Sequence, residues 1–384
     1  MKSLFTVFLA LGSFILLHAQ SVQRSFDHDN LNRTYRIYVS VNYDANKPVP
    51  LVFAFHGMGD QAANFQGIGF NQLADQDTFI VIYPQAEVDQ DFNATAWNAG
   101  VGIPGFYLNS DINDVDFVSK LIDSLSNEFS IDTQRVYATG FSLGGYMSQR
   151  LACELDARIA AIASVAGLIG NDINCNPGAP VPVLHMHGTA DSTITYGGEF
   201  PIPNFGYTKV GLSVDEMVAN WTGINNCTEP VEEDSIPDTA NDNLTIDRFT
   251  YPMCEAESEV ILYKIKHAGH EWMSSPGNDI DATIAIWEFF QKHSRKSTSV
   301  GIANAEFDNT IQVYPNPVSN TLFVKMREAA DRIMLTNLLG QELSRIENPM
   351  NLNIALSLAD INPGMYLLTV QKGSGQSTFK ILKE

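Results

Sequence analysis

Residues 135–153 read RVYATGFSLGGYMSQRLAC, and the rest of the chain can be interpreted outward from this stretch. The β-prone run 136–139 leads into GFSLG, a G-x-S-x-G motif centred on Ser142, and apolar residues at helical spacing follow it. In a nucleophile elbow the strand and the helix pass close beside a strained serine, so the turn requires small residues such as Gly140 and Gly144. The stretch therefore predicts a strand, a sharp turn that carries Ser142, and a helix.

Strand and helix patterns alternate on both sides of this stretch. β-prone apolar runs lie at residues 51–55, 79–83, 159–165, 181–187 and 260–266. The strongest of these runs are continuous, as in central strands that are covered on both faces. Helical spacing is found at residues 114–128, 213–221 and 280–293, with Asp114 as the expected N-cap of the first helix. The alternating pattern at residues 31–41 favours a half-buried antiparallel strand. Strands that alternate with helices predict a mostly parallel sheet with helices on both faces.

The two ends of the 384-residue chain differ from this middle part. Residues 1–19 combine a lysine, an apolar run and a final alanine, the pattern of a secretory signal peptide, with an uncleaved membrane anchor as the alternative. Residues 296–310 are polar, as in a linker. Residues 311–384 hold short alternating segments separated by Pro, Gly and Asn, which predict a small all-β sandwich. The main α/β domain is therefore expected at residues 20–295.

The formal net charge of −21 limits the possible partners. Phosphate binding requires clustered Lys and Arg, so nucleic acid is not expected as a partner. We interpret the acidic surplus as a solubility property. After the signal peptide no apolar run is long enough for a membrane helix, so no transmembrane segment is expected once the signal is removed.

The four cysteines all lie in the middle of a chain that is expected to be exported, where disulfides form and persist. Three pairings are possible. We favour Cys153 with Cys175 and Cys227 with Cys254, because these pairs close short loops that do not overlap, each worth on the order of 3 kcal/mol. A zinc site is the alternative, although the spacings lack the C-x-x-C signature.

A serine nucleophile needs a base and an orienting acid, and in an α/β-hydrolase these follow in the chain order Ser, Asp, His. Asp191 lies in HGTAD, directly after the strand predicted at 181–187, and His270 lies in HAGHEW, directly after the strand predicted at 260–266. We therefore predict an α/β-hydrolase with the triad Ser142, Asp191 and His270. Other candidate acids are Asp75, Asp111 and Glu271, but Asp191 alone combines the required order with the end of a strand.

An oxyanion hole needs the N–H of the residue after the nucleophile and a second N–H from the loop after an early strand. Leu143 supplies the first, and Met58 in FHGMG is our candidate for the second, with an ordinary glycine turn as the alternative. Alternate histidines at His185 and His187, together with His267, raise a metal hypothesis. No carboxylate or cysteine ligand set accompanies them in the sequence, so neither a metal nor a cofactor is expected.

The region from about residue 32 to 290 resembles the secreted feruloyl esterase and polyhydroxybutyrate depolymerase family, a carbohydrate esterase family 1 type of α/β-hydrolase. The resemblance rests on His56-Gly57, on RVYATGFSLGG, on HGTAD and on GHEW. It implies that His56, Trp97 and Trp272 belong to the substrate pocket, with a core role for either tryptophan as the alternative. The segment 192–211 is longer than the family's usual loop, so it is expected to shape the cleft, and Met58 stands where family members often carry cysteine.

The tail, from VYPNP at 313–317 through PGMY to the final Lys-Glu, resembles the type IX secretion C-terminal sorting domain, with a carbohydrate-binding sandwich as the alternative. Taken together, these resemblances imply a secreted or surface-attached serine esterase that uses the type IX secretion machinery. Its expected substrate is a polysaccharide bearing feruloyl or acetyl esters. The alternatives are a polyhydroxybutyrate depolymerase, which cleaves a polyester, a peptidase on the same fold, and a non-catalytic surface-binding protein on a hydrolase scaffold.

Overall fold

The computed structural model describes residues 21–202, 206–295, 311–337, 341–349, 351–359, 361–372 and 375–384. The chain forms two compact units, residues 1–296 and 297–384, and each is described by itself. The predicted signal peptide at 1–19 and the predicted linker at 296–310 lie outside the described residues and stay predictions.

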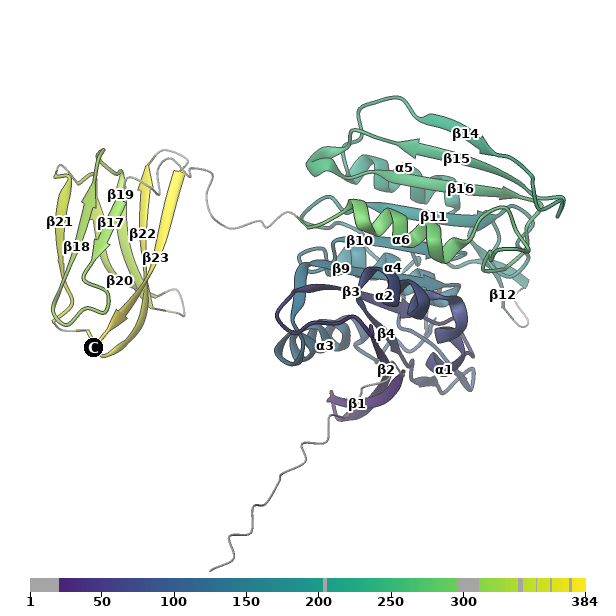
Figure 1. Cartoon of the computed structure of the whole chain (residues 1–384), viewed down its shortest axis with the longest axis horizontal. Helices are drawn as coiled ribbons and strands as arrows, with labels where there is room; N and C mark the ends of the chain where they lie inside the picture. Colours follow the sequence, from purple (N-terminus) through teal and green to yellow (C-terminus); the bar gives the residue numbers. More distant parts are fainter. Residues whose placement is uncertain are drawn as a thin grey trace, which may run out of the picture. The chain divides into compact units, whose positions relative to one another are not determined.

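The first unit is built on one ten-stranded sheet, whose strands lie side by side from β1 at one edge to β14 at the other (Figure 1). In spatial order they are β1 (Val22–His28), β2 (Leu31–Val39), β4 (Ile80–Pro84), β3 (Val49–Phe55), β9 (Ile131–Phe141), β10 (Ala161–Val165), β11 (Val183–Gly188), β16 (Val260–Lys266), β15 (Thr245–Tyr251) and β14 (Glu232–Ile236). The middle of the sheet, from β4 to β16, is parallel throughout. The strands at both edges are antiparallel, and the antiparallel strand predicted at 31–41 is confirmed as β2.

Helices cover both faces of this sheet, as predicted. They are α1 (Ala62–Phe65), the 3₁₀ turn η1 (Gln66–Ile68), α2 (Phe70–Asp77), α3 (Asp114–Glu128), α4 (Leu143–Glu154), α5 (Val214–Ile224), the 3₁₀ turn η2 (Glu255–Glu257) and α6 (Ala282–Lys292).

Two separate apolar cores result, one on each face of the sheet. Side chains of β3 alternate between them: Phe53 and Phe55 pack in the core under α3, α4 and α5, whereas Val52 and Ala54 pack in the core under α1, α2 and α6. We call the sheet faces under these two groups of helices the first face and the second face. Burial of one large apolar side chain contributes about 1.5–3 kcal/mol, so both faces anchor the sheet strongly.

The start of α3 differs from the prediction by one residue. Asn113, not Asp114, is the N-cap, and its side chain accepts a hydrogen bond from the N–H of Asp116 at 3.2 Å. Asp114 is instead fully buried and forms an ion pair with Arg33, whose Nη2 lies 2.6 Å from Asp114 Oδ1. The other oxygen of Asp114 accepts the N–H of Asn98 at 2.8 Å. This pair therefore ties β2, α3 and the loop that follows β6 (Ala94–Thr95).

Both predicted disulfides form. Cys153, near the end of α4, is bonded to Cys175, and Cys227 is bonded to Cys254. The two bridges close short loops that do not overlap, with sequence separations of 22 and 27 residues. The first bridge anchors the helix that begins at the predicted elbow to the loop that follows β10.

The second unit is all-β in its described residues, as predicted (Figure 1). A three-stranded sheet consists of β17 (Ile311–Tyr314), β18 (Thr321–Met326) and β21 (Asn353–Ser357). A four-stranded sheet consists of β20 (Glu342–Glu347), β19 (Arg332–Asn337), β22 (Gly364–Lys372) and β23 (Gly375–Lys383). Neighbouring strands are antiparallel, and alternate side chains meet in one apolar core, as in a β-sandwich.

Candidate active site

Ser142 lies at the sharp turn between β9 and α4. Its backbone has φ 54° and ψ −123°, a conformation that costs a non-glycine residue on the order of 1–3 kcal/mol. The two motif glycines are required by space: a Cβ on Gly140 would lie 2.3 Å from the carbonyl oxygen of Gly144, and a Cβ on Gly144 would lie 2.0 Å from that of Phe55. The Ser142 N–H donates to the Val165 carbonyl at 2.9 Å, which fixes the turn on the neighbouring strand. The geometry is that of the nucleophile elbow predicted from the motif.

Asp191 and His270 lie beside each other although 79 residues separate them in the chain. His270 Nδ1–H donates to Asp191 Oδ2 at 2.7 Å. The other oxygen, Asp191 Oδ1, accepts the backbone N–H groups of Thr193 at 2.8 Å and Ile194 at 2.9 Å. With its side chain fully buried and both oxygens occupied, Asp191 holds one orientation and fixes the proton of His270 on Nδ1. The Nε2 atom of His270 is thereby left as a free base.

The His270 ring lies next to the strand end that carries Ser142. Its centroid is 4.7 Å from that of Phe141, the residue directly before the serine. The side chain of His270 keeps 16% of its surface exposed, so it can meet a substrate. The structure thus brings the three predicted triad residues to the same edge of the sheet, where the parallel strands end.

Met58 and Leu143, the predicted oxyanion donors, flank Ser142. Leu143 is the first residue of α4, where helix N–H groups have no partner within the helix. The loop of Met58 is close to the serine, since a Cβ on Gly57 would lie 3.4 Å from Ser142 Cβ. Among the described residues no hydrogen bond is recorded for the Met58 N–H, whereas the next amide, Gly59 N–H, donates to Thr95 at 2.8 Å. Both residues therefore lie beside Ser142, and their role as oxyanion donors stays a prediction.

His56 and Trp97 are fully buried and hold this loop in place instead of lining a pocket. Trp97 Nε1–H donates to the His56 carbonyl at 2.9 Å. The His56 ring donates from Nδ1 to the Gly57 carbonyl at 2.7 Å and accepts the Ala86 N–H at Nε2 at 3.2 Å. Trp272 is half-buried and also lies outside the cavity lining described next. The structure therefore does not bring these three residues together as pocket walls.

A cavity of 460 Å³ opens beside Ser142, Leu143 and Met58. Its other walls are mostly apolar. Tyr146 comes from α4 and Ile194 from the loop after β11. The remaining walls come from short hairpins and their flanks: Asp91, Phe92, Val101, Gly102, Ile103, Phe106, Leu108, Phe200 and Val210. The hairpins are β5 (Val88–Asp89) with β6, β7 (Gly102–Ile103) with β8 (Phe106–Tyr107), and β12 (Glu199–Ile202) with β13 (Gly206–Lys209). The predicted role of segment 192–211 in shaping the cleft agrees with this arrangement. The walls at residues 91–108 were not predicted, because two-residue strands leave no periodic pattern.

His185 and His187 form a buried chain of hydrogen bonds behind Asp191. His187 Nε2–H donates to the Ile194 carbonyl at 2.9 Å, so its Nδ1 accepts from His185 Nε2–H at 3.1 Å. Burial is the largest cause that lowers the pKa of both rings. These histidines are thus neutral structural groups that support the turn holding Asp191.

This burial predicts that the protein loses stability in mild acid. Burial also lowers the pKa of His56. In the folded state His56, His185 and His187 therefore resist protonation, whereas in the unfolded chain they gain protons below the ordinary histidine pKa of 6.5. The free energy of unfolding should therefore fall below about pH 6.5, by up to about 1.4 kcal/mol per pH unit for each such histidine. Urea unfolding at pH 8.0, 7.0, 6.0 and 5.5 measures this. A constant free energy of unfolding from pH 7 to pH 5.5 would contradict it.

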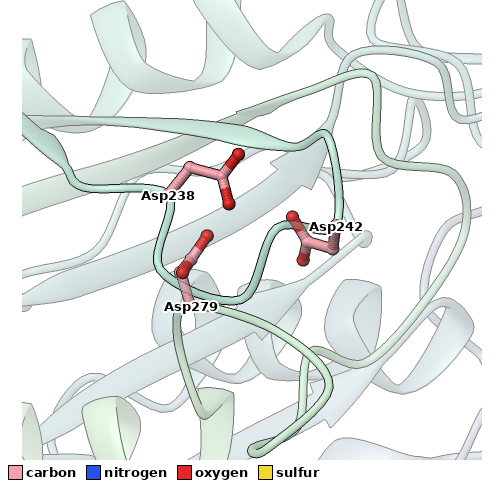
Figure 2. Close-up of side chains that lie close together, drawn as sticks. All are labelled: Asp238, Asp242 and Asp279. Atoms are coloured by element: carbon pink, nitrogen blue, oxygen red, sulfur yellow. The ribbon is translucent and has the colours of Figure 1, made fainter.

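The described residues contain one carboxylate cluster that could be considered for a metal, formed by Asp238, Asp242 and Asp279 (Figure 2). Their oxygens lie within 4.8 Å of one another, in the loop between β14 and β15 and the loop before α6. Each already accepts a backbone N–H of these loops. The hydrogen bonds of the turns account for this arrangement, and none of the three lines the cavity beside Ser142. Among the described helices none is long and apolar enough to cross a membrane.

Two segments of the chain match known protein families. Residues 33–194 match the family described as esterase PHB depolymerase, and this matched segment includes the elbow and Asp191. Residues 312–384 match the family described as secretion system C-terminal sorting domain. The chain is therefore an exported protein, secreted or attached to the cell surface, as the sequence predicted.

Individual relatives carry esterase names. The bifunctional acetylxylan esterase/xylanase XynS20E of Neocallimastix patriciarum is 27% identical over 259 residues, which cover 66% of this chain and 33% of the relative. Feruloyl esterase B of Piromyces equi is 28% identical over 234 residues, which cover 59% of this chain and 40% of the relative. The chain thus spans about a third to two fifths of the length of these two relatives.

Among solved structures, the acetyl xylan esterase from Aspergillus awamori has a TM-score of 0.46 and 16% identity, covering 65% of this chain and 94% of that one. The family matches agree with the fold, the elbow and the all-β tail seen in the structure. Residues 33–194 are thus similar to the esterase PHB depolymerase family, and residues 312–384 are similar to secretion-system C-terminal sorting domains.

Proposed function

We propose that the protein is a serine esterase that hydrolyses carboxylic esters through an acyl-enzyme. The observation that carries this proposal is the 2.7 Å hydrogen bond between Asp191 and His270, made next to a strained serine at the mouth of an apolar cavity. The hydrolase scaffold could also serve only for binding. A binding role alone would not explain why Ser142 keeps a strained backbone beside an oriented imidazole. Such strain costs free energy and is concentrated at active sites, where the surrounding structure holds it in place.

In the proposed mechanism, each of these groups has one role. Nε2 of His270 takes the proton of the Ser142 hydroxyl, whose oxygen attacks the ester carbonyl carbon. The N–H groups of Leu143 and Met58 stabilise the oxyanion of the tetrahedral intermediate. The C–O bond to the alcohol then breaks, and His270 gives its proton to the leaving oxygen. Water cleaves the acyl-enzyme by the same acid–base steps, with no cofactor.

For the substrate, we propose feruloyl or acetyl esters of plant cell-wall polysaccharide. The cavity supports the larger acyl group, because its walls include the aromatic side chains Phe92, Phe106 and Phe200 and a single carboxylate, Asp91. The names of the relatives as acetylxylan and feruloyl esterases support the same class. The second candidate is a hydroxybutyrate polyester, which is favoured by the description of the family that matches residues 33–194.

The substrate proposal is tested by measuring ferulate release from methyl ferulate by the purified full chain, beside p-nitrophenyl acetate and a suspension of polyhydroxybutyrate. We expect ferulate release, because the apolar walls bind the aromatic acyl group in the transition state, and no soluble product from the polyester. Cleavage of the acetate ester alone would keep the esterase mechanism but exclude the feruloyl substrate. Release of hydroxybutyrate would favour the depolymerase.

A further inference from the structure

The surroundings of Ser142 differ on the two faces of the sheet. Its cavity lies on the first face: Leu143, Tyr146 and Ile194, three of the lining residues, belong to the core of that face. Phe141 and Trp272 pack instead against the core of the second face. The serine at the end of the sheet therefore has the cavity on one side and the Phe141–Trp272 pair on the other.

His270 belongs to the second side. Its ring lies over Phe141, and its neighbours in the chain, Ala268 and Met273, are part of the core of the second face. In ester hydrolysis this imidazole gives its proton to the leaving alkoxide, so the alcohol part of the ester must lie next to it when the C–O bond breaks. The acyl part then faces the cavity, and the alcohol part faces the residues around His270.

Those residues form a fixed aromatic surface. The Trp272 ring is 6.4 Å from that of Phe141 at an angle of 82°, and it rests edge-on against the buried Phe65 at 5.7 Å. Trp272 Nε1–H donates to Thr283 Oγ1 at 3.1 Å, which fixes the indole orientation. Phe141 and Trp272 are both half-buried, so each keeps part of its surface open to solvent. A pre-oriented aromatic face binds flat, partly apolar groups at little entropic cost.

We propose that Trp272, together with Phe141, forms the alcohol subsite of the enzyme and stacks against a sugar ring of the polysaccharide that bears the ester. This inference rests on the proposed esterase function and adds to it the residues that recognise the leaving group. It also reassigns Trp272 from the acyl pocket, which the resemblance implied, to the opposite side of the serine. The apolar C–H face of a pyranose or furanose ring matches an indole face, whereas a methyl alcohol is too small to cover it.

The test compares two esters with the same acyl group and different alcohols: methyl ferulate and a feruloylated arabinoxylo-oligosaccharide. In the Trp272→Ala variant we expect kcat/KM for the oligosaccharide ester to fall about tenfold, mainly through KM, as for the loss of one good aromatic contact. For methyl ferulate it should change less than about twofold, because this ester does not reach Trp272. Trp272→Phe should recover part of the loss. Phe106→Ala, on the acyl side, should change both esters by the same factor.

A binding measurement separates this inference from the esterase proposal. Of the four tryptophans, Trp97, Trp221 and Trp287 are buried and Trp272 alone is half-exposed, so its fluorescence reports a ligand on its face. The free arabinoxylo-oligosaccharide should change the fluorescence of Ser142→Ala but not that of Ser142→Ala/Trp272→Ala. If the wild type hydrolyses no ester, the function fails while this titration still decides the subsite. Equal losses for both esters in Trp272→Ala, or no fluorescence change with the saccharide, would overturn the inference.

Discussion

Replacing Ser142 with alanine should lower kcat for p-nitrophenyl acetate by a factor on the order of 10⁴–10⁶, because the attacking oxygen is lost while the oxyanion donors remain. The fold should be unaffected. Alanine has the same Cβ as serine, so the strained backbone at φ 54° keeps its cost and its hydrogen bond to Val165. Initial rates with excess enzyme, together with a urea unfolding curve, measure both expectations.

The matched control is Ser148→Ala, which removes another hydroxyl from the same helix. Ser148 is buried and its hydroxyl donates to the Gly144 carbonyl at 3.0 Å, away from the cavity lining. We expect this variant to keep activity within about threefold, as for the loss of one hydrogen bond that does not contact substrate. Residual activity of Ser142→Ala above about one per cent would contradict the assignment of the nucleophile.

Replacing Asp191 with asparagine should lower kcat by a factor on the order of 10⁴, although the two side chains have the same shape. The backbone N–H groups of Thr193 and Ile194 donate to Asp191 Oδ1, and they would clash with an NH₂ group at that position. In the asparagine variant the amide oxygen must therefore occupy the position of Oδ1. The amide NH₂ then faces His270 Nδ1, where the carboxylate accepted a proton. The imidazole is forced into the tautomer with its proton on Nε2, and it can no longer act as base toward Ser142.

Asp75→Asn is the control for this prediction. Asp75, one of the other candidate acids in the sequence, accepts hydrogen bonds from the Tyr38 hydroxyl at 2.6 Å and the Val41 N–H at 3.0 Å. Its substitution should leave kcat within about threefold, since it loses hydrogen bonds far from the chemistry. Similar kcat losses in Asp75→Asn and Asp191→Asn would show that Asp191 has no special role.

The placement of Ser142, Asp191 and His270 at one edge of the sheet could be predicted because three independent constraints converge. The G-x-S-x-G turn has a steric cause, and Asp191 and His270 each follow a strand whose apolar run is long enough to recognise. Parallel strands bring their carboxyl ends to one edge, so residues far apart in sequence meet there. The central strands were predictable for the same reason, since burial on both faces leaves a continuous apolar run.

The cavity walls and the sheet edges carry no such constraint. The hairpins that present Phe106 and Phe200 have strands of two to four residues, which leave no periodicity. The edge strand β14 reads EEDSI and is exposed, so it is held by pairing with β15 and not by an apolar face. Trp97 shows the remaining difficulty. An aromatic residue in a loop is compatible with a pocket or a core, and the structure places Trp97 in the core by its full burial and its hydrogen bond to the His56 carbonyl.

The crowding around the elbow limits how this protein can be redesigned. At Gly140 and Gly144 a single added methyl group would collide with main-chain atoms, so these two positions accept no larger residue. The cavity beside Ser142 is different, because three of its aromatic walls, Phe92, Phe106 and Phe200, project from hairpins that contain none of the predicted triad residues. The residues that would select the acyl group can therefore be changed separately from Ser142, Asp191 and His270. Mutant libraries confined to residues 101–108 and 199–202 should yield variants with new acyl-chain selectivity and an unchanged hydrogen bond between Asp191 and His270.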